Sequence, residues 1–326
     1  MNQYIVITSI HEPSDAVAKW ARLPNWRVLV VGDRKTPSDW NFDGVEYLSP
    51  EAQRELVPGL ADVLPWNTYI RKNIGYAVAI RRGASAIFET DDDNLPYPDA
   101  HSVLQRVISA EERPAEVNGS TGWYNAYEYF GAPGVWPRGY PLERIHEKAN
   151  PPAVGGASAR PLVWQFLADR EPDVDAIFRL TRSQEVRFEP APSIVLGSGT
   201  YCPFNSQATL WLPDAYPLMF LPTGVSDRVT DILRGFMVQR ALWAAGSSVG
   251  FCSPIVYQER NEHNLLRDLE DEMRLYTHAE LWRNRLNAVL CTGSFTHDMK
   301  AILSSVLGDE VVDHYARFIA EIENGL

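Results

Sequence analysis

The sequence has few cysteines and lacks any long hydrophobic run. Cys202, Cys252 and Cys291 are the only cysteines among 326 residues, and they form neither zinc-type pairs nor a disulfide framework. No stretch approaches the ~20 consecutive apolar residues that span a bilayer. The first residues, beginning at Met1, show no basic segment or cleavage site of a secretion signal. We therefore expect a cytoplasmic protein with free thiols and no integral membrane segment.

Basic residues are also scarce relative to acidic ones. The chain has 30 Lys and Arg against 42 Asp and Glu, which gives a net charge of −12. Such a field repels polyanions, so nucleic acid is not an expected partner, although a local basic pocket for a small phosphate stays compatible with it. The 45% hydrophobic and 11% aromatic content is ordinary for a globular chain and excludes a disordered, collagen-like or coiled-coil protein.

Several common nucleotide and metal motifs are missing. The chain has no Walker lysine motif and no Gly-x-Gly-x-x-Gly, so ordinary ATPase and dinucleotide-binding functions lack support. An EF-hand counted from Asp91 would need Gly and Glu where Pro96 and Ser102 stand. The chemistry must therefore come from another pattern.

Alternating strand and helix signals fill the first ninety residues. Apolar runs predict strands at 4–8, 27–31 and 84–90, and a helix at 69–82 precedes the last of them. Ser14 can cap a helix between the first two strands. Repeated units of this kind predict an α/β fold with a doubly wound, mostly parallel sheet flanked by helices.

The amino-acid composition changes after residue 115. Residues 115–224 are rich in Trp, Tyr, Pro and Gly, which predicts short strands and long loops, and helical signals return at 225–245, 265–290 and 297–323. We expect one catalytic domain over 1–260 and a helical C-terminal extension over 261–326. The Trp and Leu stripe in that extension favours core packing or a homodimer seam.

The sharpest motif is the acidic run Asp91-Asp92-Asp93-Asn94. It directly follows the predicted strand, and parallel sheets bind ligands at the carboxyl ends of their strands. Asp91 and Asp93 are two residues apart, so on extended backbone they point to the same side. Their oxygens suit Mg²⁺ or Mn²⁺, which usually also binds substrate phosphates. The alternative is a solvated acidic loop.

Arg71 and Lys72 precede this run, in the first turn of the predicted helix. Free N–H groups and the helix dipole already favour anions there, so two cations at this place indicate an anionic ligand. The alternative is that both side chains face solvent.

Several blocks of sequence in this order resemble the STELLO-type glycosyltransferase family and, more distantly, the plant UDP-arabinopyranose mutases. The blocks are Val31-Gly32-Asp33-Arg34-Lys35-Thr36-Pro37, Tyr69-Ile70-Arg71-Lys72-Asn73-Ile74-Gly75-Tyr76, Ile87-Phe88-Glu89-Thr90-Asp91-Asp92-Asp93, Trp136-Pro137-Arg138-Gly139-Tyr140-Pro141-Leu142-Glu143, Pro172-Asp173-Val174-Asp175-Ala176-Ile177-Phe178, Pro203-Phe204-Asn205-Ser206 and Asp231-Ile232-Leu233-Arg234-Gly235. They extend from the first strand to about Tyr257. The helical tail after about His263 lies outside the resemblance.

The resemblance implies a GT-A-type, Rossmann-like fold and a nucleotide-sugar donor held by a divalent metal. It places the Asp-x-Asp metal motif on Asp91 and Asp93. The resemblance also implies Thr8, Ser9, Asp33 and Asp92 at the nucleotide sugar, Arg71 and Lys72 at its diphosphate, and His263 completing the metal shell. Asn205 and Ser206 can hydrogen-bond sugar hydroxyls, and Trp136 offers an apolar face to a pyranose ring, with loop packing as the alternative for all three. Plant members of the family are membrane-anchored, whereas we expect no anchor here.

The catalytic base implied by the resemblance is Asp231. Asp227 lies one helical turn earlier on the same face and is the second candidate. The alternative for Asp231 is an ion pair with Arg234 within the same helix. The expected function is metal-dependent transfer of a sugar, from a UDP-sugar by preference, to a carbohydrate or glycan hydroxyl. A nucleotide-sugar mutase and a non-catalytic nucleotide-sugar or glycan-binding protein are the alternatives.

Overall fold

The computed structural model describes residues 2–153, 159–182, 184–259 and 264–324. The strands within these ranges are β1 (Gln3–Thr8), β2 (Trp26–Val31), β3 (Val45–Leu48), β4 (Ala86–Thr90), β5 (Asn94–Pro96), β6 (Ala115–Val117), β7 (Arg160–Asp169), β8 (Ile194–Leu196), β9 (Ala208–Trp211) and β10 (Ser247–Gln258). The α-helices are α1 (Asp15–Trp20), α2 (Pro50–Leu56), α3 (Pro58–Ala61), α4 (Lys72–Arg81), α5 (Ala100–Ile108), α6 (Ala126–Tyr129), α7 (Ala176–Thr181), α8 (Asp227–Ala244), α9 (Leu265–Asp271), α10 (Met273–Ala288), α11 (Phe295–Leu307) and α12 (Asp309–Glu323). Short 3₁₀ helices are η1 (Tyr69–Arg71), η2 (Leu142–Arg144) and η3 (Pro213–Leu218).

The described strands form one ten-stranded sheet in the order β3-β2-β1-β4-β9-β7-β10-β8-β6, with β5 paired to β10. Strands β3, β2, β1 and β4 run parallel, whereas β9 is antiparallel to both of its neighbours, β4 and β7. The carboxyl ends of β1, β2 and β4 therefore lie at one edge of the sheet. The α/β class with a mostly parallel sheet is confirmed, and the antiparallel β9 joins its two parts.

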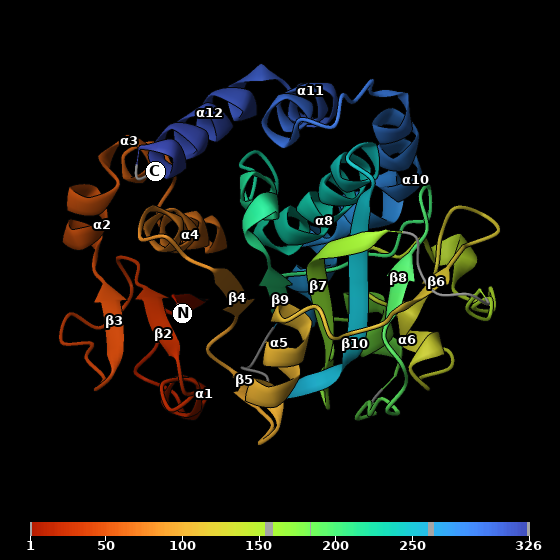
Figure 1. Ribbon diagram of the computed structural model, residues 1–326, viewed down its shortest axis with the longest axis horizontal. Coiled ribbons are helices and arrows are strands. Elements are labelled where there is room, and N and C mark those ends of the chain that lie inside the picture. The colour runs from red at the N-terminus through yellow and green to blue at the C-terminus, as the bar shows by residue number, and fades with distance from the viewer. Residues whose placement is uncertain (1, 154–158, 183, 260–263, 325–326) are drawn as a thin grey trace.

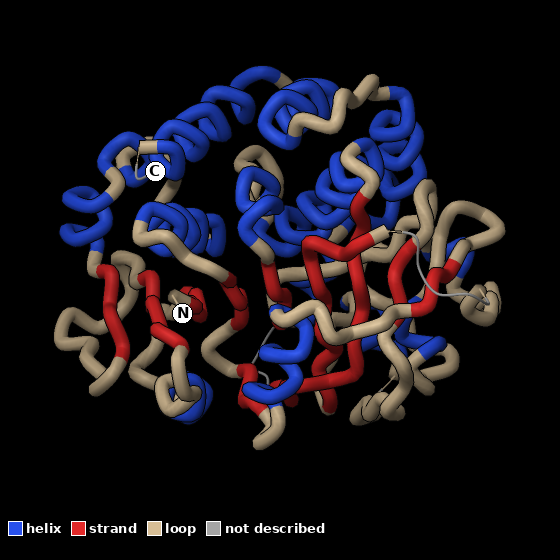
Figure 2. The backbone as a smooth tube through the Cα atoms, in the orientation of Figure 1, coloured by secondary structure: helices blue, strands red, loops and turns tan. Residues whose placement is uncertain are grey.

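Helices cover both faces of the sheet (Figure 1, Figure 2). Alternate residues of β1 explain how both faces are apolar, because Tyr4 and Val6 pack into one core cluster and Ile5 and Ile7 into the other. The first cluster includes side chains of α4, α8 and the C-terminal helices, and the second includes those of α1 and α5. The result is a three-layer α/β/α arrangement.

Local signals account for where the early helices begin. Ser14 accepts a hydrogen bond from the backbone N–H of Val17, which makes it the N-cap of α1, as its sequence position predicts. Thr68 accepts from the N–H of Ile70 and so caps η1, which continues directly into α4. The helix predicted over 69–82 is therefore a 3₁₀ turn followed by an α-helix.

The C-terminal helices pack on the first core cluster, to which Trp282, Met299 and Phe318 contribute. The last helix, α12, reaches back to α3 and α4 near the start of the chain, as Figure 1 shows. There Glu321 accepts a hydrogen bond from the N–H of Gly59 and pairs with Arg81 at 3.2 Å. The predicted domain division at residue 260 and the homodimer seam stay predictions.

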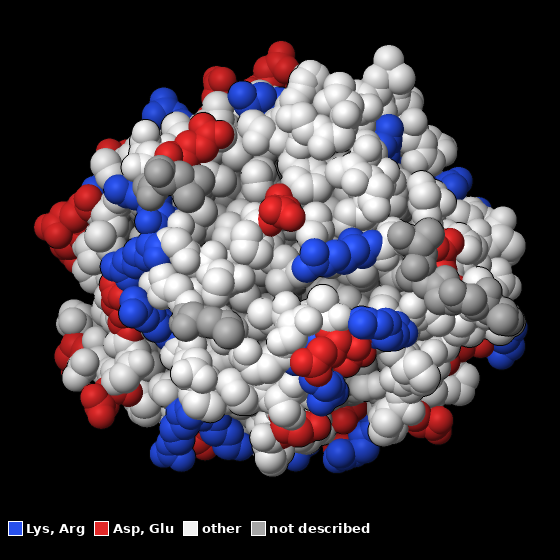
Figure 3. All heavy atoms as spheres, viewed as in Figure 1, with Lys and Arg blue, Asp and Glu red and all other residues white. Residues whose placement is uncertain are grey.

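Acidic and basic side chains are interspersed on the face seen in Figure 3, mostly around its margin. None of the helices in the described ranges combines the length and apolar character that crossing a membrane needs.

Candidate active site

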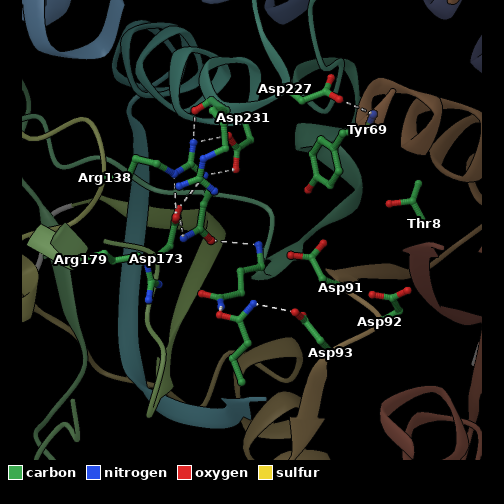
Figure 4. Close-up of a pocket in the computed structure, with 14 residues that line it drawn as sticks. Thr8, Tyr69, Asp91, Asp92, Asp93, Arg138, Asp173, Arg179, Asp227 and Asp231 are labelled. Atoms are coloured by element: carbon green, nitrogen blue, oxygen red, sulfur yellow. Dashed lines mark hydrogen bonds and ion pairs between the residues drawn. The ribbon is translucent and has the colours of Figure 1, made fainter. Parts of the chain in front are cut away.

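Two adjoining cavities lie beyond the carboxyl ends of β1, β2 and β4. The first has a volume of about 270 Å³, and its lining includes Asp91, Asp92 and Asp93 (Figure 4). The second, of about 220 Å³, includes Ser9 and Asp33. Both share the residues Thr8, Tyr69, Asp92 and Asp227. A ligand longer than one cavity can therefore occupy both, at the edge of the sheet where parallel strands present ligands.

The acidic run forms one wall of the first cavity, directly after β4. Lys72 Nζ lies 2.8 Å from Asp91 Oδ1, Ser9 donates its hydroxyl to Asp92, and Gln258 Nε2 donates to Asp93 Oδ2 at 3.0 Å. Burial raises the pKa of Asp91, and the adjacent Lys72 opposes that rise. All three carboxylates border the same space, so the acidic run lines a cavity at the end of β4, and its role there stays a prediction.

The two cations that precede the run both turn inward. The Lys72 side chain is fully buried and donates to Asp91 Oδ1, to the carbonyls of Thr90 and Ser206 and to the hydroxyl of Tyr69. It is not among the residues lining either cavity. A solvent-facing Lys72 is therefore wrong, and direct contact with a diphosphate is not what this arrangement offers.

Arg71 is 1% exposed and borders the second cavity. Its guanidinium donates to Gln53 and to the carbonyls of Ala61 and Leu64, and it stacks on Trp66 with 3.6 Å to the ring centroid. Burial lowers the pKa of Arg71 to about 10. These partners tie Arg71 to the surrounding protein instead of presenting its donors to a diphosphate.

The opposite wall comes from α8, which contributes Asp227 and Asp231 on one face, as predicted. Arg138 donates to both oxygens of Asp231, at 3.2 and 3.1 Å, and to both oxygens of Asp173, at 2.7 and 2.8 Å. The intrahelical pair of Asp231 with Arg234 is wrong, because Arg234 instead points into the core and pairs with Glu89 at 2.6 Å.

The absence of a side chain at Gly139 allows the loop that carries Arg138 to pack closely against α8. Gly139 has φ of +88°, and a Cβ there would lie 2.4 Å from Cγ2 of Ile232. The loop carrying Arg138 can therefore rest directly on the helix that carries Asp231. Asp173 holds the same loop from the other side, because its carbonyl accepts from the N–H of Arg138.

Asp227 joins the two cavities. Its oxygens accept from the hydroxyl of Thr68 and from the N–H of Tyr69, the latter at 3.2 Å. The residue as a whole is exposed, but enclosure of its carboxyl group raises the pKa of Asp227. A carboxylate at a cavity with a raised pKa suits a general base better than one with both oxygens on a guanidinium.

Asp33 fixes the loop that precedes η1. It is 5% exposed and accepts from the N–H groups of Asn67 and Thr68, at 2.7 and 3.3 Å. Asn67 has φ of +57°, the left-handed conformation that asparagine tolerates. Asp33 thus borders the second cavity, together with Thr8 and Ser9, and also shapes it.

The remaining predicted residues differ in their placement. Asn205 lines the first cavity and donates to Asp173 at 2.9 Å, whereas Ser206 is fully buried and not among the lining residues. Trp136, expected as a platform for a sugar ring, is buried and donates to Asp175. His263 lies outside the described residues.

Sequence reasoning missed several residues that line the first cavity. They are Tyr69, Arg138, Asp173, Arg179, Gln207, Arg228 and Gln258. Arg138 and Asp173 lie within blocks that carry the family resemblance, so a charged residue inside each block was an available signal. Gln258 ends β10, a strand whose position the sequence did not reveal.

The first cavity is rich in carboxylates. Six aspartates and three arginines line it, and each arginine is engaged: Arg138 as above, Arg179 by Glu171 and Arg228 by Glu272. Among the described residues, no group of three or more His, Cys, Asp or Glu side chains is arranged to hold a metal ion by itself. Any cation bound here would need ligands from a substrate or from water as well.

Two plant proteins are similar to this chain. "Probable glycosyltransferase STELLO2" of Arabidopsis thaliana is 32% identical over 277 residues, which cover 78% of this chain and 35% of that protein. "Probable glycosyltransferase STELLO1" of the same plant is 32% identical over 274 residues, with the same shares. The chain thus spans about a third of the length of these relatives. The resemblance to the STELLO-type family is confirmed. No protein-family model matches the chain.

Solved structures show a looser likeness, at 10% sequence identity. A mycobacterial protein superposes with a TM-score of 0.43 over 86% of this chain and 74% of its own. The glucosyl-3-phosphoglycerate synthase of M. tuberculosis gives 0.41 over 86% and 80%, and TarS of S. aureus gives 0.37 over 94% and 43%.

Proposed function

Because this chain is related to the STELLO-type glycosyltransferases over most of its length, we propose that it is a GT-A-type glycosyltransferase. It would move a sugar from a nucleotide-sugar donor, a UDP-sugar by preference, to a hydroxyl of a carbohydrate acceptor. The observation that carries the proposal is the first cavity, where the acidic run after β4 faces Asp227 and Asp231 of α8. The donor would extend from there into the second cavity, with its nucleoside beside Asp33.

A divalent cation, Mn²⁺ or Mg²⁺, fits the charge of this cavity. Six lining carboxylates and no unengaged arginine would repel a diphosphate that arrived alone. Asp91 and Asp93 would hold the cation, with the donor phosphates and water as its other ligands. When bound, the cation would supply charge that neutralises the departing diphosphate.

The other polar residues of the first cavity would have different roles. Asp227 would accept the proton of the acceptor hydroxyl, because its pKa is raised and its carboxyl group borders both cavities. Asp231 and Asp173, both held by Arg138, would orient the sugar through oxygens fixed in place. Asn205 would contribute an amide beside them.

A panel of nucleotide sugars tests the proposal by thermal shift, with and without Mn²⁺. We expect at least one donor to raise the melting temperature only when Mn²⁺ is present, and to be hydrolysed slowly or transferred to a sugar acceptor. Conversion of the donor into a sugar isomer would instead identify a mutase. Stabilisation without any turnover across an acceptor panel would identify a binding protein.

A further inference from the structure

Tyr69 is one of the residues that line both cavities. The sequence motifs predicted no function for it. It opens η1, and its backbone N–H donates to Asp227. Figure 4 shows its hydroxyl directed into the first cavity, toward the side of Asp91. Its position is therefore fixed at the backbone by one wall of the cavity, while its phenol points toward the other wall.

The hydroxyl of Tyr69 has its proton available. Lys72 Nζ lies 3.0 Å from it, and an ammonium group can only donate, so the tyrosine oxygen accepts this hydrogen bond. A phenol has one proton to donate and an ordinary pKa of about 10, so it stays neutral at physiological pH. Within the described residues, no side chain or carbonyl accepts the phenolic proton. The proton is left to a group that enters the cavity.

Lys72 also places this hydroxyl beside the acidic run. The same ammonium donates to Asp91 Oδ1 at 2.8 Å, so the phenol oxygen and the Asp91 carboxylate are neighbours across one buried cation. The Lys72 ammonium cannot reach the cavity, but its hydrogen bond polarises the phenol and strengthens the phenol as a donor. Lys72 thus influences a ligand in the cavity through the hydroxyl of Tyr69.

We propose that the Tyr69 hydroxyl donates a hydrogen bond to the diphosphate of the nucleotide-sugar donor. Phosphate oxygens only accept, which matches a hydroxyl whose proton is free and whose oxygen already serves Lys72. Of the neutral donors that line the first cavity, Asn205 and Gln258 already donate to Asp173 and Asp93, whereas the Tyr69 hydroxyl can donate to a diphosphate. This role rests on the proposed function and assigns it a further substrate-binding residue.

Calorimetric titration of Tyr69→Phe tests the role. The variant keeps the ring and removes only the hydroxyl, and Lys72 retains Asp91 and two carbonyls as partners. Tyr216→Phe is the control, because it also removes a single tyrosine hydroxyl, one that donates to the carbonyl of Ala84 at 3.1 Å and lines neither cavity. Each protein is titrated with UDP, GDP and ADP in Mn²⁺, with the corresponding nucleosides and with the sugar-bearing nucleotides.

We expect Tyr69→Phe to weaken binding of the preferred nucleoside diphosphate about 10- to 100-fold, as loss of a hydrogen bond to a charged group does. Nucleoside binding should be unchanged, and Tyr216→Phe should bind like the wild type. Equal diphosphate affinity in Tyr69→Phe and wild type would overturn the role. So would a loss confined to the nucleotide sugar, which would place the bond on the sugar. A wild type that binds none of these nucleotides contradicts the proposed function itself, and with it this role.

Discussion

Arg234 and Glu89 form an ion pair between α8 and β4 in which neither side chain is exposed to solvent, with 2.6 Å between guanidinium and carboxylate. Tyr76 and Trp211 complete the network by donating to the two oxygens of Glu89. The pair lies beneath the cavity, since α8 carries Asp227 and Asp231 and β4 leads into the acidic run. It therefore connects the two walls that the proposed chemistry requires.

Removing either partner of this pair should destabilise the protein strongly. Glu89→Gln and Arg234→Met each leave a polar or charged group buried without its partner, which costs about 3–5 kcal/mol. Urea unfolding measures the change, and the double variant should lose less than the sum of both. Arg54→Ala, which breaks an exposed pair with Asp62, is the control, with an expected loss of about 0–1 kcal/mol. Additive losses in the double variant would contradict a coupled pair.

Asp93→Asn should abolish Mn²⁺-dependent stabilisation by the nucleotide sugar while leaving the fold intact. The amide keeps the size of the side chain but removes the charge that would attract the cation. Thermal shift with donor, with and without Mn²⁺, measures this. An unchanged Mn²⁺-dependent shift would remove Asp93 from the metal site.

Asp91→Ala should lose the same metal-dependent shift and, in addition, melt at a lower temperature without ligand. The extra loss follows from Lys72, which is fully buried and would lack its carboxylate partner. Melting temperatures of ligand-free Asp91→Ala and Asp93→Asn separate the two effects. Equal stability of both variants would mean that Lys72 does not depend on Asp91.

Asp227→Asn should reduce turnover by about 10²–10⁴-fold with donor binding preserved, as expected for loss of a general base. The pKa of Asp227 is raised, so the acidic limb of the rate profile should lie above the pH at which an ordinary aspartate titrates. Turnover against pH, with Asp231→Asn in parallel, identifies the base. Normal turnover in Asp227→Asn would transfer that role to Asp231.

Asp175 should impose a pH dependence on stability. Burial raises the pKa of Asp175 to about 6, although Phe178 N–H and Trp136 donate to its oxygens. A raised folded-state pKa gives a contribution that is complete below about pH 4, the ordinary pKa of aspartate, and is lost as the pH rises through 6. That contribution is at most about 3 kcal/mol. Chemical unfolding from pH 4 to 7 should be flatter in Asp175→Asn, and an identical slope would contradict the assignment.

Local sequence patterns predicted the strands in the first half of the sheet but not those in the second half. Strands β1, β2 and β4 are short apolar runs ended by polar residues, which predicts them directly. Strand β7 is buried almost throughout but carries Gln165 and follows a loop-rich stretch, and β10 contains Pro254 and Gly250. Their ladders form with partners distant in sequence, which local patterns do not encode.

The site shows the same division. The acidic run and the α8 carboxylates follow from strand ends and helical spacing. The inward turn of Lys72 and Arg71 and the bridging by Arg138 depend on long-range packing, in which Gln53, Thr90 and Gly139 decide where each cation points. Their residue types predicted that Arg71 and Lys72 would bind a diphosphate. In the structure both are buried and hydrogen-bonded to other groups of the protein.

The contact of α12 with α3 and α4 has a consequence for synthesis of the chain. Glu321 is bonded to Gly59 and Arg81, so the packing around α3 and α4 is completed only when α12 has been made. A nascent chain would expose that apolar face of α4 until α12 had left the ribosome. The region around α3 and α4 is thus made well before the helix that completes its packing.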